Sequence, residues 1–149
     1  MQIEERLEIL KKVANAAALA GLKGQVDGDG KHFAMGFNTN EGRSQTVYIR
    51  HTGKTPEGQD IVTLFSPALT VKKGMFSGMS KEQAIGLLRL NESTFFARFG
   101  IWETDTESMV VASSDLILDT IDPNELKAHA YYVAYAADNY EAKHGVDKF

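Results

Sequence analysis

Residues 33–71, FAMGFNTNEGRSQTVYIRHTGKTPEGQDIVTLFSPALTV, decide the fold class. Their apolar side chains alternate with small or polar ones, at the two-residue period of a strand with one covered face. Residues 38–43 and 52–58 carry the turn residues that separate three such runs. The denser apolar run at 61–65 is typical of a strand covered on both faces. The stretch therefore predicts a three-stranded antiparallel meander.

An amphipathic helix is predicted before the meander, over residues 3–20. Glutamates occupy its first turns, where carboxylates interact favourably with the helix dipole. Gly21 and Gly24 follow it and end the helix. Its expected apolar face consists of Ile3, Leu7, Leu10, Ala14 and Ala17, widened by Ile9, Val13 and Ala16.

Two further helices are predicted from their start signals. Ser80 followed by Gln83 is a capping-box pattern, in which each residue satisfies a backbone N–H of the other. Asp122 opens the last helix, with Pro123 at the first helical position and Glu125 as the box partner. The expected buried stripe of the last helix is Leu126, Ala130, Val133, Ala137 and Tyr140.

Two strands are predicted between these helices, at residues 95–102 and 108–112, joined by an acidic turn. Consecutive Phe95 and Phe96 would then point to opposite faces of the sheet. Both faces would carry a large apolar group there, so the surface would be covered by a helix or available for dimerisation.

The element order is therefore α-β-β-β-α-β-β-α. Runs of strands separated from helices indicate the α+β class with an antiparallel sheet packed by helices. We find no repeat or interdomain linker, so residues 1–149 are expected to form a single domain. Residues 72–79 are the expected flexible connection.

Composition narrows the function classes. The chain has 16 Lys and Arg against 20 Asp and Glu, a formal charge of −4, which argues against a nucleic-acid-binding protein. It contains no cysteine, which excludes disulfides, thiolate-bound zinc, iron–sulfur clusters and cysteine nucleophiles. The acidic, amphipathic start MQIEERLEIL differs from a secretory signal, and no apolar run has the length of a membrane helix. We expect a soluble, cytoplasmic protein.

Acidic residues gather in one stretch, residues 99–126, which contains no Lys or Arg. Such a stretch is most often a solvated edge, and the alternative is a face for a basic partner. The seven acids are Glu103, Asp105, Glu107, Asp115, Asp119, Asp122 and Glu125.

No catalytic, cofactor-binding or metal-binding motif is present. The chain lacks a GxSxG elbow, a P-loop, a GxGxxG fingerprint and an HExxH helix. A Ser/His/Asp triad assembled in space stays open, because such triads are not encoded by sequence order. We therefore predict no catalytic residue, no cofactor and no metal.

Two features come closest to a metal site. Asp27-Gly28-Asp29-Gly30 resembles the start of a calcium loop, but Lys31 and Asn38 stand where that loop needs oxygen ligands, so a turn is predicted. The histidines His32 and His51 flank neighbouring strands, and packing is favoured over metal binding.

A family resemblance becomes visible in residues 87–141, LLRLNESTFFARFGIWETDTESMVVASSDLILDTIDPNELKAHAYYVAYAADNYE. A helix ending in LLxLN leads to the strand ARFGI, an acidic turn, a second strand and a short Asp-Leu segment. A long helix with Ala-Asp and Tyr follows. This pattern resembles the YbjN family of bacterial sensory-transduction regulators, which is related in fold to the type III secretion chaperones. The N-terminal helix and the meander follow the same plan.

The resemblance implies a homodimeric, bacterial, cytoplasmic protein of secretion-chaperone-like fold, without known catalysis. Proteins of the wider fold hold partner segments in extended form along grooves and sheet edges. The first hypothesis is accordingly a non-enzymatic chaperone-like or regulatory module with a protein client or regulatory partner, and without nucleic-acid or membrane binding. The expected dimer or partner interface, from helix two and the following strand, is Leu87, Leu88, Phe96, Arg98 and Trp102.

Two rival functions remain open. A small-molecule sensor would use the Tyr131 and Tyr135 face of the last helix beside a sheet carrying Tyr48 and Arg50. An enzyme would need a perturbed histidine or carboxylate in a cleft.

Overall fold

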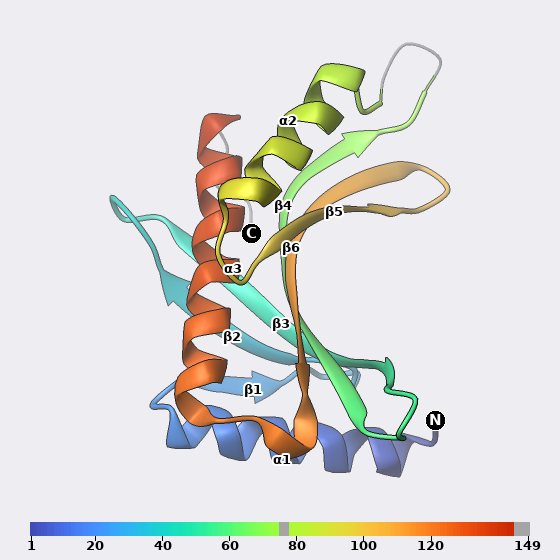
Figure 1. Ribbon diagram of the computed structural model, residues 1–149, viewed down its shortest axis with the longest axis vertical. Coiled ribbons are helices and arrows are strands. Elements are labelled where there is room, and N and C mark those ends of the chain that lie inside the picture. Colours follow the sequence, from blue (N-terminus) through green and yellow to red (C-terminus); the bar gives the residue numbers. More distant parts are fainter. Residues whose placement is uncertain (75–77, 145–149) are drawn as a thin grey trace.

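The protein has an α+β fold, and in the part of the chain that the structure describes three α-helices pack on one six-stranded antiparallel sheet (Figure 1). The computed structural model describes residues 1–74 and 78–144. Within them, the predicted fold class is confirmed, and the only strand absent from the predicted order is the short β1. The elements are α1 Ile3–Leu19, β1 Gly24–Val26, β2 Phe33–Asn38, β3 Ser44–Lys54, β4 Asp60–Lys72, α2 Lys81–Ser93, β5 Arg98–Glu103, β6 Glu107–Ile117, the 3-10 turn Leu118–Thr120 and α3 Pro123–Lys143.

The sheet is a single layer with strand order β1-β2-β3-β4-β6-β5, and all neighbours are antiparallel. The predicted meander forms its β2-β3-β4 part. β4 and β6 are the long central strands and bend along their length (Figure 1). The register of β4 against β6 shifts between Pro67 and Leu69, and such an extra residue bends a strand.

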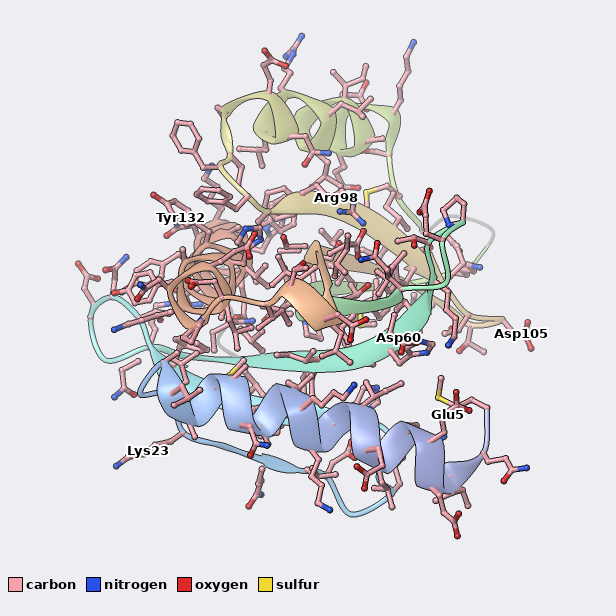
Figure 2. The ribbon with its side chains drawn as sticks, turned by 60° about the horizontal axis from the view of Figure 1, so that its bottom comes forward. Glu5, Lys23, Asp60, Arg98, Asp105 and Tyr132 are labelled. Carbon is pink, nitrogen blue, oxygen red and sulfur yellow. The ribbon has the colours of Figure 1, made fainter. Side chains whose placement is uncertain are left out.

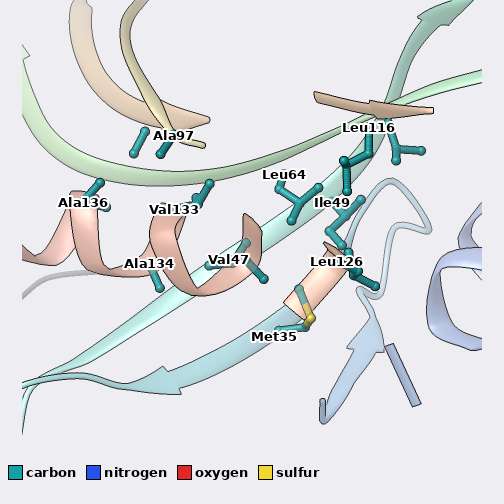
Figure 3. Close-up of a cluster of buried hydrophobic side chains, with 14 of the residues drawn as sticks. Met35, Val47, Ile49, Leu64, Ala97, Leu116, Leu126, Val133, Ala134 and Ala136 are labelled. Carbon is teal, nitrogen blue, oxygen red and sulfur yellow. The ribbon is translucent and has the colours of Figure 1, made fainter. Parts of the chain in front are cut away.

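The helices share a single hydrophobic core with one face of the sheet. Figure 3 shows part of this core, where Val47 and Ile49 of β3 and Leu64 of β4 meet Leu126 and the alanines of α3. The predicted stripe of α3 is buried throughout. α1 buries Ile9, Leu10, Val13 and Ala17, whereas Ile3 and Leu7 stay exposed.

The helix ends follow the predicted signals. Leu22 N–H donates to the Ala17 carbonyl and Gly21, at φ +74°, donates to Ala18, which is a Schellman end for α1. The Ser80–Gln83 capping box is formed in both directions. The Asp122 carboxylate accepts the backbone N–H groups of Asn124 and Glu125 at the start of α3. The return bond from the Glu125 side chain, expected for a capping box, is not formed among the described residues. No described helix is both long and apolar enough to cross a membrane.

Two predicted strand ranges are wrong. The strand expected over 95–102 begins at Arg98, because Phe96 has φ +60° and cannot continue an extended strand. Phe95 and Phe96 instead form a turn between α2 and β5. β6 is longer than the predicted 108–112, since its residues 114–117 continue the ladder with β4 beyond the residues that pair with β5. The flexible connection predicted over 72–79 includes residues 75–77, which lie outside the described residues.

Candidate functional site

The sheet face opposite the helices carries a row of aromatic rings. Because Val47 and Ile49 point into the core, Tyr48 and Arg50 point to this open face. Tyr48 stacks on Phe65 at 5.4 Å between ring centroids, and Phe65 lies 4.7 Å from Trp102. The guanidinium carbon of Arg50 lies 4.5 Å from the Trp102 centroid and 5.3 Å from that of Phe65. Arg50 is therefore held by two aromatic rings.

The bend of the sheet explains why the Arg50 side chain reaches the ring of Trp102. Trp102 on β5 is paired with Met109 on β6. Arg50 on β3 is paired with Thr63 on β4, and Thr63 is paired with Asp115 on β6, six positions after Met109. On a flat sheet these rows would be too far apart for contact. The bend in β4 and β6 brings the β5–β6 hairpin over the end of β3.

A hollow of about 350 Å³ lies between these rows. A chain of polar contacts crosses it: Thr52 and Thr63 hydroxyls lie 2.8 Å apart, Thr63 donates to Asp115 at 2.6 Å, and Arg98 donates to the other oxygen of Asp115 at 2.6 Å. Polar groups thus converge beside the Trp102 ring, as in ligand sites. The lining residues are Arg50, Thr52, Gly53, Ile61, Thr63, Arg98, Trp102, Ser113 and Asp115.

A second surface lies on the helix side of the molecule. The Ala97 N–H donates to the Phe95 carbonyl at 2.6 Å, which makes residues 95–97 a γ-turn centred on Phe96 at φ +60°. Phe95 is 70% exposed and Phe96 57% exposed. Phe96 lies 4.8 Å from His129 and 5.3 Å from Tyr132 between ring centroids, and Phe95 lies 6.3 Å from Tyr132. We call Phe95, Phe96, His129 and Tyr132 the aromatic patch.

The five expected interface residues do not share one surface. Leu87 is 4% exposed and belongs to the core, so it offers no surface. Leu88 is exposed on α2, and Phe96 lies in the aromatic patch. Arg98 and Trp102 lie on the open sheet face, by their pairing with Ser113 and Met109. Figure 2 shows Tyr132 of the patch and Arg98 well apart.

The grouping expected for a sensor is not formed. Tyr131 lies 6.2 Å from Phe37 and stacks on Tyr135, with 3.0 Å between their hydroxyls, on the helix side of the sheet. Tyr48 and Arg50 lie on the other face. The alternation of side chains along β3 separates the two pairs, and the sequence alone does not reveal which face the last helix covers.

His32, directly before β2, and His51, which lies within β3, each pair with their own aspartate. His32 Nδ1 lies 2.8 Å from Asp27, and His51 Nε2 lies 2.9 Å from Asp60. Asp27 also accepts the backbone N–H groups of Lys31 and His32. Partial burial alone would raise the pKa of Asp27, but the hydrogen bonds from His32, Asp29 and Lys31 lower it to about 2.

Asp27, Asp29 and His32 lie close enough to share an ion, with their ligand atoms within 4.8 Å of one another. Their acceptor oxygens are already used. Asp27 binds two backbone N–H groups and the imidazole, and Asp29 accepts the Lys31 N–H and pairs with its ammonium at 3.2 Å. This arrangement is that of the predicted turn.

A serine–histidine contact is present in the interior. Ser114 Oγ lies 2.6 Å from His129 Nδ1, and Ser114 is 3% exposed. Burial lowers the pKa of His129 below its usual range, and the Glu125 carboxylate opposes that shift. A nucleophile needs access to substrate, and Ser114 lacks it. The contact satisfies a buried hydroxyl.

Most of the acidic stretch 99–126 is paired or used in a cap. Asp122 caps α3, as described above. The other pairs are Asp115 with Arg98 at 2.6 Å, Asp119 with Lys12 at 3.8 Å, and Glu103 with Lys73. These contacts favour the interpretation of residues 99–126 as a solvated edge over the alternative of a face for a basic partner.

No protein-family model matches this chain, and no curated protein sequence matches it.

Proposed function

We propose that the chain is a non-enzymatic, homodimeric protein-binding module with a chaperone-like or regulatory role. The observation that carries this proposal is the aromatic patch. Its two adjacent phenylalanines, Phe95 and Phe96, are 70% and 57% exposed, although the next residue, Ala97, is buried in the core. Exposed aromatic clusters of this kind are typical of protein interfaces, where Phe, Tyr and Trp supply much of the binding energy.

Backbone strain supports the same proposal. A phenylalanine at φ +60° costs free energy that a glycine at this position would avoid. Strained backbone of this kind clusters at functional sites. The turn holds the Phe96 ring against His129 and Tyr132, which fixes its orientation before any partner arrives.

The family resemblance points in the same direction. The pattern of residues 87–141 resembles the YbjN family, and that resemblance implies a secretion-chaperone-like fold and a homodimer. We include in the proposal a bacterial cytoplasmic location and a protein client or regulatory partner.

The test is self-association of surface variants. Phe95→Ser and Phe96→Ser remove the two most exposed rings of the patch. Leu19→Ser is the matched control, because Leu19 is an apolar residue on α1 that is even more exposed, at 79%. Light scattering at micromolar concentration should show a dimer for the wild type and for Leu19→Ser. The two patch variants should shift towards monomer by at least about tenfold in dissociation constant. Equal masses for all four proteins would contradict the proposal.

A second candidate function is ligand sensing through the hollow on the open sheet face. Its support is the convergence of Arg50, Thr63 and Ser113 beside Trp102. A protein with both features could bind a ligand on one face and a partner on the other.

A further inference from the structure

Among the residues that the structure describes, the guanidinium of Arg50 has no anionic partner. Its Nε is buried without a hydrogen bond, and within residues 1–74 and 78–144 no carboxylate pairs with it. Its neighbours are the rings of Phe65 and Trp102. A buried N–H donor without an acceptor is costly, so the hydrogen-bonding capacity of this guanidinium is incompletely used within the described residues.

The hollow has a net charge of about one positive unit, counting the charged residues that line it. Arg98 is neutralised by Asp115 at 2.6 Å. Both oxygens of that carboxylate are used, one by Thr63 and the other by Arg98, so Asp115 is held away from Arg50. The unmatched charge is that of Arg50, and it is complementary to one monoanion.

The other groups in the hollow define the rest of the ligand. Trp102 and Ile61 supply apolar walls, and Thr52 and Ser113 supply hydroxyls. A volume of about 350 Å³ is at the lower end of the range for small-molecule sites. An extended peptide would need a longer groove than this hollow.

We propose that the hollow binds a small organic monocarboxylate, with its carboxylate on the Arg50 guanidinium and its apolar body against Trp102. Guanidinium groups favour carboxylates, because two parallel N–H donors match the two oxygens. This inference concerns the open sheet face, and it holds or fails independently of self-association through the aromatic patch.

Trp102 makes a direct assay available, because it is the only tryptophan in the chain. Benzoate is the probe, and benzamide is its neutral analogue of the same shape. Benzoate should change the Trp102 fluorescence in a saturable way, with benzamide at least about tenfold weaker. Equal responses to the two compounds, or no saturable response to benzoate up to about 50 mM, would overturn the inference.

Two variants change the charge of the hollow in opposite directions. Arg50→Gln should weaken benzoate binding about tenfold or more, and Asp115→Asn should strengthen it several-fold, because Arg98 is then also available. Arg89→Gln, at an exposed arginine on α2, is the control and should leave binding unchanged. Circular dichroism verifies that each variant is folded, and Arg50→Met, which removes the charge but keeps an unbranched side chain between the rings, replaces Arg50→Gln should the latter unfold. An affinity for benzoate that is unchanged in both the Arg50 and the Asp115 variant would overturn the inference.

Discussion

Arg43 donates a 2.8 Å hydrogen bond from Nε to Oδ1 of Asp138, a residue 95 positions later in the chain. The turn between β2 and β3 is thereby tied to α3. Asp138 is 1% exposed, and Glu141, one turn further along α3, is fully buried with its Oε2 at 3.5 Å from Arg43 Nη2. Two buried carboxylates of α3 thus share a cation from a distant hairpin.

Removing that cation should be strongly destabilising. Arg43→Met leaves the two carboxylates in the interior without their guanidinium, and we expect the free energy of unfolding to fall by about 3–5 kcal/mol. Urea denaturation followed by circular dichroism measures this loss. Arg43→Lys keeps the positive charge but not the planar guanidinium with its several N–H donors. It should therefore lower the free energy of unfolding by less than Arg43→Met does. A change below about 0.5 kcal/mol for Arg43→Met would show that the pair contributes little.

The strain at Phe96 can be measured by comparing two small residues. Both Phe96→Ala and Phe96→Gly remove the ring contacts with His129 and Tyr132, but only glycine adopts φ +60° without a penalty. Phe96→Gly should therefore be more stable than Phe96→Ala by about 1 kcal/mol in urea unfolding. The reverse order, which is the usual one for these two residues in regular structure, would mean that the turn is not strained.

Gly24 should tolerate no side chain. A Cβ at Gly24 would lie 2.6 Å from the Ala34 carbonyl oxygen, and backbone cannot move aside cheaply. Gly24→Ala should lower the free energy of unfolding by about 1–3 kcal/mol. Gly36 on β2 is the control, because a Cβ added there would meet no described atom within 4 Å. Thermal unfolding of Gly24→Ala and Gly36→Ala should separate the two, and equal melting temperatures would contradict the close approach of β1 to β2.

Asp27 should make stability depend on pH in the acid range. Its pKa is lowered from 3.8 to about 2 in the folded protein, so the folded state favours the carboxylate more than the unfolded state does. The stabilisation is present above about pH 4 and is lost as the pH falls towards about 2. Asp27→Asn lacks this titration. The difference in urea midpoint between wild type and Asp27→Asn should shrink from pH 4 to pH 2, and a constant difference would contradict the assignment.

Local signals in the sequence predicted the framework of the fold. The Ser80–Gln83 box, the Asp122–Pro123 start and the alternation through β2 and β3 depend on neighbouring residues, and all were confirmed. The three-residue β1 was missed, because GQV is too short for a period to be recognised. The turn at Phe96 was missed as well, because an apolar aromatic pair is more often part of a strand.

The candidate site was harder to predict, because it depends on long-range geometry. Pairing of Arg43 with Asp138, and of Arg50 with Trp102, requires knowledge of which strand edges meet and how the sheet bends. Nothing within a few residues of Arg50 indicates its aromatic neighbours. The interface prediction combined Phe96 with Arg98 and Trp102 because they are close in sequence, whereas the turn at Phe96 sends them to different faces.

Self-association through the aromatic patch can be measured by sedimentation equilibrium of the wild-type protein from about 1 to 100 µM. We expect a mass that rises with concentration from that of the 16.4 kDa chain to twice that value. Phe96→Ser should stay near the monomer mass over the same range. A wild-type mass of 16.4 kDa at every concentration would contradict self-association.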